Sequence, residues 1–436
     1  MNLNPLFYLS TNQFPIGRDF NRGIEKIKAF SLLKKLVFIF WIIGPFIYLI
    51  ERDPADLWLS SIGLIFIIRC FVKNDWAWIG QWWVIFTILL YISGLMSALL
   101  GPYKSFSFYE GLLWIRFPIY AAAAQVWLGQ DKDIRKVMFI SILGGMLLMC
   151  IILFLELNIE PKQRLTWPYG DHLPGSYIAK ISLPVICGFI TLISLKFIKP
   201  SIIFFIISLS GVVFVFLTGE RGNFLIVISS LFLSLILFRK SKKILFLSLI
   251  IFISISMISL ASINFLYKNQ FLRFTNQFVN SIPIINMSDN NPYWGAWRSG
   301  IQQALEKPLI GLGPGSSRKH CSQMSYDQKD WLPGKNYCGN HPHNYYIQLM
   351  SETGLIGLIF GSLMFFFIIK TCFNATKINK NCPLNKIFFL IPIVLFFPLQ
   401  QTGNFFGQWS NLFIWFSLGY SLSNSNNYKS LLLKKS

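Results

Sequence analysis

The chain has 436 residues, of which 54% are hydrophobic, 17% are aromatic and only 13% are charged. Because a soluble domain usually carries about 25% charged residues, this composition indicates an integral membrane protein. The formal net charge of +21 would suggest nucleic-acid binding in a soluble protein, but membrane topology explains most of it, so we expect no nucleic-acid partner. Residues 1–30 lack the apolar core and cleavage site of a signal peptide, so the first hydrophobic span is expected to direct insertion.

Apolar runs long enough to cross a hydrocarbon core of about 30 Å recur along the chain. We therefore expect an all-α, polytopic integral membrane protein with about twelve transmembrane helices. Residues 1–33 and 423–436 would be cytoplasmic, residues 34–264 would contain nine spans, residues 265–342 one long loop, and residues 343–422 three spans. The predicted spans are residues 34–50, 55–72, 80–100, 109–128, 135–157, 176–195, 201–217, 222–238, 242–264, 343–370, 386–400 and 404–422.

Lysines and arginines predict the orientation of these spans, because cytoplasmic segments near the membrane retain an excess of positive charge. An even number of spans puts both chain ends on the same side, and their lysines and arginines predict that this side is the cytoplasm. The basic connections that contain Arg135, Lys136, Arg239 and Lys240 then lie inside as well. The long polar segment 265–342 is consequently expected outside the membrane.

Loops as long as this outer segment are usually functional or disordered, and its tryptophans and Pro-Gly turns favour a folded cap. Cys321 and Cys338 both lie in it, where an oxidising compartment permits a disulfide that would contribute about 3 kcal/mol in the chain-entropy model. A zinc site is the alternative because three histidines lie nearby, but the spacings match no zinc signature. We therefore expect a disulfide and no metal.

The segment 341–347 is predicted to open a helix, because polar sequence and a proline precede an apolar run. On an ideal helix Gly354 lies within about 20° of His343, and Gly357 about 40° to the other side. His343 would then stand above a small-residue stripe against which another helix packs closely. The positive end of the helix dipole disfavours an imidazolium, which suits His343 to act as a general base. The alternative is that His343 only caps the helix or contacts headgroups.

Three motifs carry a resemblance to a known family. His343-Asn344, nine residues, Gly354, two residues and Gly357 match the O-antigen ligase pattern of His, then Asn, Ser or Gln, nine residues, Gly, two residues, and Gly, Thr or Tyr. Segment 308–315, Pro-Leu-Ile-Gly-Leu-Gly-Pro-Gly, looks like a loop motif of that family. Segment 218–222, Thr-Gly-Glu-Arg-Gly, is similar to its Thr-x-Ser-Arg-Gly turn, with Glu220 in the serine position. The chain therefore resembles the O-antigen ligase family.

The resemblance implies a GT-C-like membrane glycosyltransferase that passes a glycan from undecaprenyl pyrophosphate to an acceptor hydroxyl outside the membrane, without nucleotide sugar, metal or cofactor. It also implies that His343 removes the acceptor proton while arginines hold the pyrophosphate, where charge develops as the glycosidic bond breaks. Arg221 is the first candidate for such an arginine, in a short turn where the family places one that binds phosphate. A salt bridge with Glu220 is the alternative for Arg221.

Two other arginines are candidates for binding the donor pyrophosphate. Arg298 follows Trp297, whereas the family arginine usually precedes the tryptophan by a few residues. Arg116 lies within a predicted span, where a charge usually marks a partner or a pathway, and Glu110 is its candidate partner.

The resemblance places the protein in a bacterial inner membrane, with many spans, lipid contacts and an active site that faces the periplasm. The leading hypothesis is a ligase that uses the lipid A core oligosaccharide as acceptor. The alternatives are an O-antigen polymerase, which accepts another lipid-linked repeat, and a protein O-oligosaccharyltransferase. The single dominant outer loop favours the ligase, because polymerases more often have two. A transporter or flippase would show intramembrane charges and repeated halves, and beyond Arg116 the sequence shows neither.

Overall fold

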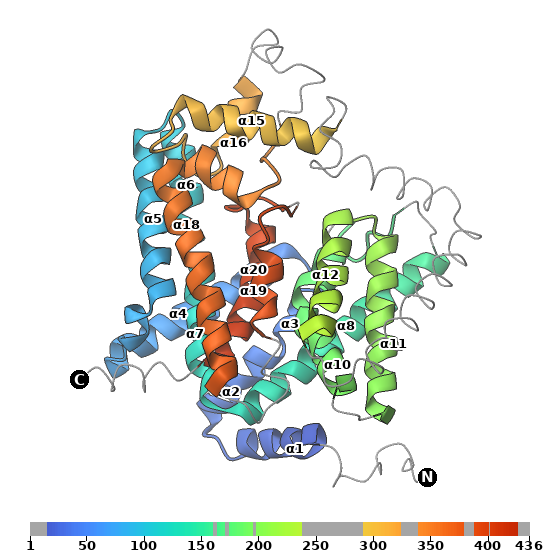
Figure 1. The fold of residues 1–436 in the computed structure, drawn as a ribbon. Helices are drawn as coiled ribbons and strands as arrows, with labels where there is room; N and C mark the ends of the chain where they lie inside the picture. Colours follow the sequence, from blue (N-terminus) through green and yellow to red (C-terminus); the bar gives the residue numbers. More distant parts are fainter. Residues whose placement is uncertain are drawn as a thin grey trace.

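The computed structural model describes residues 15–159, 164–170, 174–194, 198–237, 291–323, 339–378, 388–400 and 402–425. All regular elements in these ranges are helical (Figure 1). The all-α prediction is therefore confirmed for the described part of the chain. The predicted span 242–264 lies outside the described residues.

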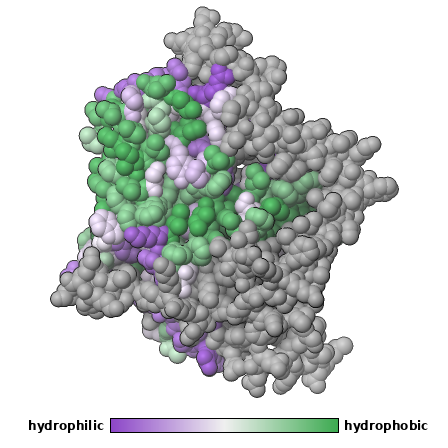
Figure 2. All heavy atoms as spheres, viewed as in Figure 1, coloured by the Kyte–Doolittle hydropathy of each residue, from purple (hydrophilic) through white to green (hydrophobic). Residues whose placement is uncertain are grey.

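Four of the described helices are long and apolar enough to cross a membrane: α4 (Arg52–Lys73), α5 (Trp82–Leu100), α8 (Lys132–Ile159) and α18 (Tyr345–Ile378). Large hydrophobic side chains on them face outward, and Leu57 and Phe71 remain 71% and 70% exposed. Figure 2 shows a broad apolar surface over α5 and α18, with hydrophilic residues at both ends. Such a surface is favourable in lipid and costly in water, so the chain has the character of a membrane protein.

Several predicted spans are interrupted, so twelve uninterrupted spans are not confirmed. The apolar stretches were located from hydropathy, which does not register a missing backbone donor. Pro118 has no N–H to bond the carbonyl four residues earlier, and the predicted span 109–128 divides just there. Two other predicted spans, 34–50 and 176–195, are also divided, and each has a proline near a division, Pro45 and Pro184 respectively. The resulting pieces are α2 (Leu32–Ile42) and α3 (Gly44–Ile47), α6 (Lys104–Trp114) and α7 (Arg116–Trp127), and α9 (Pro174–Ser176), the π-helical η3 (Tyr177–Ile181) and α10 (Leu183–Ser194).

The two ends of the molecule carry different helices (Figure 1). At one end α1 (Pro15–Lys28) packs along α8, and Lys26 forms ion pairs of 2.8 Å with both Asp131 and Asp133. At the opposite end α15 (Pro292–Glu306) and α16 (Ser316–Gln323) lie over the membrane helices. The basic α1 therefore lies at the end of the apolar helices opposite to α15 and α16.

The interior is centred on α20 (Gln408–Leu422), which is buried from Asn411 onward and packs against α7. The Asn411 side chain accepts hydrogen bonds from the indoles of Trp114 and Trp415 at 3.1 and 2.9 Å. Its amide nitrogen donates to the carbonyls of Phe405 and Gly407 at 2.6 and 2.8 Å. Asn411 thus fixes the loop 402–407 that leads into α20. Three further α-helices are α11 (Ile198–Leu217), α12 (Arg221–Leu237) and α19 (Leu390–Leu395).

Helix α18 is not continuous, because Gly354 has a φ of 67° and a ψ of −171°. That conformation is essentially restricted to glycine. The backbone groups released at the break would be costly to leave unpaired in a membrane, and the segment 308–313 pairs with them from both sides. The four hydrogen bonds are Leu312 N to Ser351 O (3.0 Å), Gly313 N to Glu352 O (2.8 Å), Leu355 N to Pro308 O (2.8 Å) and Ile356 N to Leu309 O (3.4 Å).

The break corrects the expected role of the glycines in α18. His343 precedes the helix and Gly354 interrupts it, so the ideal helical wheel that placed both on one face does not apply. Gly354 is required because a Cβ there would overlap the Leu309 carbonyl group. Gly357 does face a neighbouring helix, since its Cβ would lie 3.4 Å from Ser93 Oγ on α5.

We predict that Gly354→Ala lowers the melting temperature of the detergent-solubilised protein by several degrees. Backbone strain alone should cost about 1–3 kcal/mol, and the overlap with Leu309 adds to it. Gly80→Ala is the matched control, because a Cβ at Gly80 meets nothing within 4 Å. Equal melting temperatures for the two variants would contradict the proposed reason for this glycine.

Candidate functional site

Asn344 is the N-cap of α18. Its side-chain oxygen accepts hydrogen bonds from the backbone N–H groups of Tyr346 and Ile347 at 3.0 and 3.2 Å, which is the usual geometry of a capping asparagine. Its amide nitrogen donates to the Pro398 carbonyl at 2.6 Å. The capping role that was an alternative for His343 therefore belongs to Asn344.

His343 lies just outside the helix, with a φ of 55° that L-residues seldom adopt. It is linked twice to the loop 402–407. The Thr402 N–H donates to the His343 carbonyl at 2.9 Å, and His343 Nδ1 lies 3.2 Å from the Thr402 carbonyl oxygen. These two contacts fix both the backbone and the ring of His343.

The contact with Thr402 defines the tautomer of the histidine. A carbonyl oxygen only accepts hydrogen bonds, so Nδ1 carries the proton and, in the neutral ring, Nε2 keeps its lone pair. Burial lowers the pKa of His343, and the hydrogen bond to Thr402 partly opposes that effect. The ring is therefore held neutral, with Nε2 available as a proton acceptor.

The His341 ring lies beside His343, with 4.1 Å between the ring centroids and an angle of 54° between the ring planes. Burial and the neighbouring His343 lower the pKa of His341 to about 3. A hydrogen bond to the backbone of Thr402 has the opposite but smaller effect on this pKa. A second histidine at the site was not assigned a role from the sequence, although the His-x-His spacing was visible. Among the described residues no group of three metal-ligating side chains is present, so these imidazoles are paired with each other rather than clustered with acids.

Tyr293 connects His343 with Arg221. Its ring lies edge-on to the imidazole, with 5.2 Å between centroids, and the Arg221 guanidinium carbon lies 5.9 Å from the same ring. Arg221 is the first residue of α12 and Tyr293 belongs to the first turn of α15. Three segments far apart in the sequence therefore meet at one site, and Tyr293 is a member that no sequence pattern indicated.

The turn before Arg221 is anchored by Glu220. Its carboxylate accepts hydrogen bonds from Gly175 N at 2.7 Å, from Ser176 Oγ at 3.1 Å and from the Asn223 side chain. Burial raises the pKa of Glu220, and the charge of Lys180 and these donors oppose the rise. Glu220 thus ties the turn to the segment 174–176 and fixes where α12 begins. The helix N-terminus and Arg221 together favour an anion at this position.

The other two candidate arginines are placed differently. Arg298 lies on α15 five residues after Tyr293, about 140° further around the helix. Arg116 pairs with Asp56, not with Glu110, through contacts of 2.8 and 3.1 Å from two nitrogens of its fork. Glu110 instead pairs with Arg318 at 3.2 Å. A donor-binding role for Arg298 or Arg116 stays a prediction, and the Asp56 pair already uses the paired donors of Arg116.

Residues 203–361 match the O-antigen ligase family model. The chain carries an O-antigen ligase domain. Arg221, Tyr293, His343 and the Gly354 break all lie within the matched range. No curated protein matches the chain. The family and the apolar helices together indicate a bacterial membrane protein of the ligase and polymerase type.

The outer part of this domain contains a disulfide. Cys321 is disulfide-bonded, whereas Cys70, Cys150, Cys187 and Cys372 are free. The predicted partner, Cys338, lies outside the described residues, so the pairing stays a prediction. Near Cys321, His320 contacts Tyr103 and Glu306 at 3.1 and 3.0 Å, which joins α16 to α15 and to the start of α6.

We predict that peptide mapping of the unreduced protein recovers a crosslinked Cys321–Cys338 peptide that disappears on reduction. Closure of this short loop should contribute about 3 kcal/mol, so the Cys338→Ser variant should melt at a lower temperature. A Cys382→Ser variant is the control, and recovery of Cys321 crosslinked to Cys382 would overturn the pairing.

Proposed function

We propose that this protein is a membrane glycosyltransferase that moves a glycan from undecaprenyl pyrophosphate to a hydroxyl of the lipid A core oligosaccharide, at the periplasmic face of the inner membrane. The observation that carries the proposal is the hydrogen bond between His343 Nδ1 and the Thr402 carbonyl. It leaves Nε2 of a neutral imidazole free to take a proton, which is what a general base requires. The O-antigen ligase match at residues 203–361 supports the reaction class.

In the proposed reaction His343 Nε2 accepts the proton of the acceptor hydroxyl. The hydroxyl oxygen forms a bond to the anomeric carbon as the bond from that carbon to the pyrophosphate oxygen breaks. The electron pair leaves with undecaprenyl pyrophosphate. Arg221 and the N-terminus of α12 stabilise the charge that develops on this leaving group.

Tyr293 is proposed to align the base with the anion-binding group. Its ring contacts the His343 ring and also lies beneath the Arg221 guanidinium. The donor and the acceptor must meet between these groups for transfer to occur, since reacting atoms need to be held about 3 Å apart. A fixed aromatic ring with two such contacts supports that alignment.

An O-antigen polymerase with the same donor is the second candidate, because the matched family supports both reactions. A protein O-oligosaccharyltransferase differs again only in its acceptor. Deletion of the gene distinguishes the first two. Unattached lipid-linked polymer in the deletion strain supports the ligase, whereas lipid-linked single repeats indicate the polymerase.

We predict that His343→Ala lowers the rate of transfer by roughly 10² to 10⁴, the usual contribution of a positioned general base. The assay supplies purified protein with an undecaprenyl-linked glycan and rough lipid A core, without nucleotide sugar, and follows attachment. His320→Ala is the matched control, because that histidine lies on α16 and contacts Tyr103 and Glu306. It should remain active.

The pH dependence gives a second readout for His343. Because burial lowers its pKa below the ordinary 6.5, the base stays neutral as the pH falls, and kcat/KM should decline only below that value. A wild-type midpoint above 6.5, or normal transfer by His343→Ala, would remove His343 from the role of base.

We predict that Arg221→Lys lowers transfer roughly ten- to hundredfold, because a single ammonium cannot reproduce the paired donors of arginine toward a phosphate. Arg318→Lys is the control, since Arg318 is half exposed and pairs with Glu110 in the outer segment. If Arg221→Lys transfers the glycan as fast as the control, Arg221 does not bind the pyrophosphate.

A further inference from the structure

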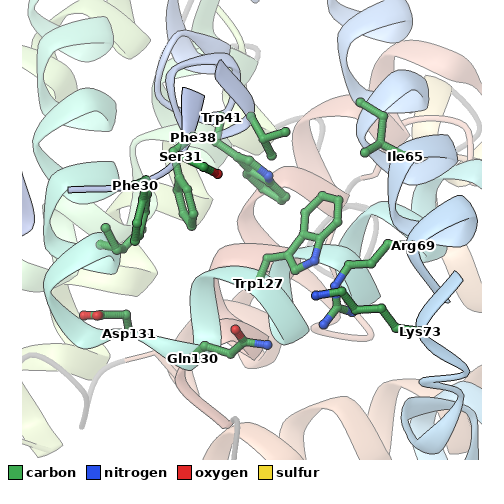
Figure 3. A pocket seen from close by; sticks show the side chains of 12 residues that line it. Phe30, Ser31, Phe38, Trp41, Ile65, Arg69, Lys73, Trp127, Gln130 and Asp131 are labelled. Atoms are coloured by element: carbon green, nitrogen blue, oxygen red, sulfur yellow. The ribbon is translucent and has the colours of Figure 1, made fainter. Parts of the chain in front are cut away.

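A cavity of about 570 Å³ lies at the end of the molecule opposite to the candidate site. It is enclosed by the connection between α1 and α2, by α2, by the last turns of α4, and by the segment 127–134 (Figure 3). The proposed glycan transfer makes no use of this cavity. Its lining residues are Phe30, Ser31, Val37, Phe38, Trp41, Ile65, Arg69, Lys73, Trp127, Gln130, Asp131 and Ile134.

One side of the cavity is apolar and borders the lipid-facing surface. Phe30 and Phe38 lie across the cavity from Ile65 of α4 (Figure 3), and Val37 also lines it. Ile65 is itself 39% exposed, and Ile68, on the outer face of the same helix, is 53% exposed. Since α4 is apolar and long enough to span a membrane, the apolar side of the cavity continues onto the surface that acyl chains cover.

The other side of the cavity presents hydrogen-bond donors without acceptors. Arg69 Nη1 and Trp41 Nε1 are both excluded from solvent, and neither has a hydrogen-bond partner in the described ranges of the chain. The Arg69 guanidinium reaches Asp75 only through Nη2, at 3.4 Å. A buried donor left unpaired costs about 1–3 kcal/mol, so an acceptor group of a ligand at this position would be stabilising.

The charge of the cavity favours an anion. Arg69 and Lys73 lie together on the α4 side (Figure 3). The lining holds these two cations and one carboxylate, Asp131, which shares Lys26 with Asp133 through ion pairs of 2.8 Å each. A phosphate group supplies several acceptor oxygens, and arginine binds such oxygens through its planar fork.

We infer that this cavity binds one anionic phospholipid. The phosphate accepts hydrogen bonds from Arg69 and Trp41, Lys73 adds to the attraction, and an acyl chain lies against Phe38 and Ile65. A lipid fits better than free phosphate because seven of the twelve lining residues are apolar and the cavity borders the lipid-facing surface of α4. The site is independent of the proposed glycan transfer, because none of its residues contacts His343, Tyr293 or Arg221 in the described part of the chain.

Native mass spectrometry of the purified full-length protein in detergent tests the inference, with phosphatidylglycerol, phosphatidylcholine and inorganic phosphate as probes. We expect phosphatidylglycerol to bind about tenfold more tightly than phosphatidylcholine, and inorganic phosphate not to displace it. Arg69→Gln and Trp41→Phe should each weaken phosphatidylglycerol binding by about tenfold or less, the size expected for one hydrogen bond to a charged group.

Two control variants separate the cation from its surroundings. Asp75→Asn removes the ion pair with Arg69 but leaves the guanidinium, so binding should be retained or strengthened. Arg52→Gln removes an exposed arginine at the opposite end of the same helix and should have no effect. Elution of each variant as a monodisperse species verifies folding, and Arg69→Lys replaces Arg69→Gln if the latter aggregates.

Three outcomes would overturn the inference. Equal binding of phosphatidylglycerol, which is anionic, and phosphatidylcholine, whose phosphate is balanced by choline, would show that the net negative charge of the headgroup is not recognised. Displacement by inorganic phosphate would make the cavity a simple anion site. Unchanged binding in both the Arg69 and the Trp41 variants would place the lipid elsewhere.

Discussion

The pairing of backbone groups at the Gly354 break is the constraint on which the rest of the outer half depends. In a hydrocarbon environment each unpaired N–H or C=O is costly, so a helix can be interrupted only where another segment replaces its hydrogen bonds. The segment 308–313 does so with bonds to both halves of α18. Because that segment follows α15 directly, the break determines where α15 lies.

Helix α15 in turn covers the segment that carries His343. Gly300 leaves no space for a side chain, since a Cβ there would come within 2.7 Å of both Pro342 and Ile347. The backbone of α15 therefore packs directly on the segment that carries His343, with Tyr293 over the imidazole. From the other side the loop 402–407 is held to α18 by Gln348, which bonds Asn404 and the Phe405 N–H at 2.7 and 2.8 Å. The imidazole is thus fixed between two segments that are themselves anchored to one helix.

Much of this arrangement was predictable from the sequence, but only where the signal is local. Hydropathy located the apolar stretches, and the prolines explain why several of them divide. The histidine motif and the Pro-Leu-x-Gly-x-Gly-x-Gly segment were both recognised, yet as separate features. Their relation depends on hydrogen bonds between residues about forty positions apart along the chain, which no periodicity encodes.

The same limit applies to charges and conformations. The pairing of Arg116 with Asp56 joins residues 60 positions apart, whereas the candidate Glu110 was near in sequence. The assumption of an ideal helix put His343 and Gly354 on one face. A helical wheel assigns every residue helical dihedral angles, so it cannot represent the positive φ at either residue. Tyr293 was missed since its role comes from which helix lies above the site, and that follows from the break.

The group that orients His343 is a main-chain carbonyl at position 402. Any amino acid other than proline supplies the same oxygen together with the N–H that binds the His343 carbonyl, provided that the loop keeps its path. Because Thr402 is buried, a saturation scan of position 402 should tolerate side chains of similar size at a point on which the proposed base depends. The sensitive positions would be Gln348 and Asn411, which hold the loop. Substitutions in this part of the protein are therefore expected to act through the shape of the loop, because the atom that contacts the imidazole belongs to the main chain.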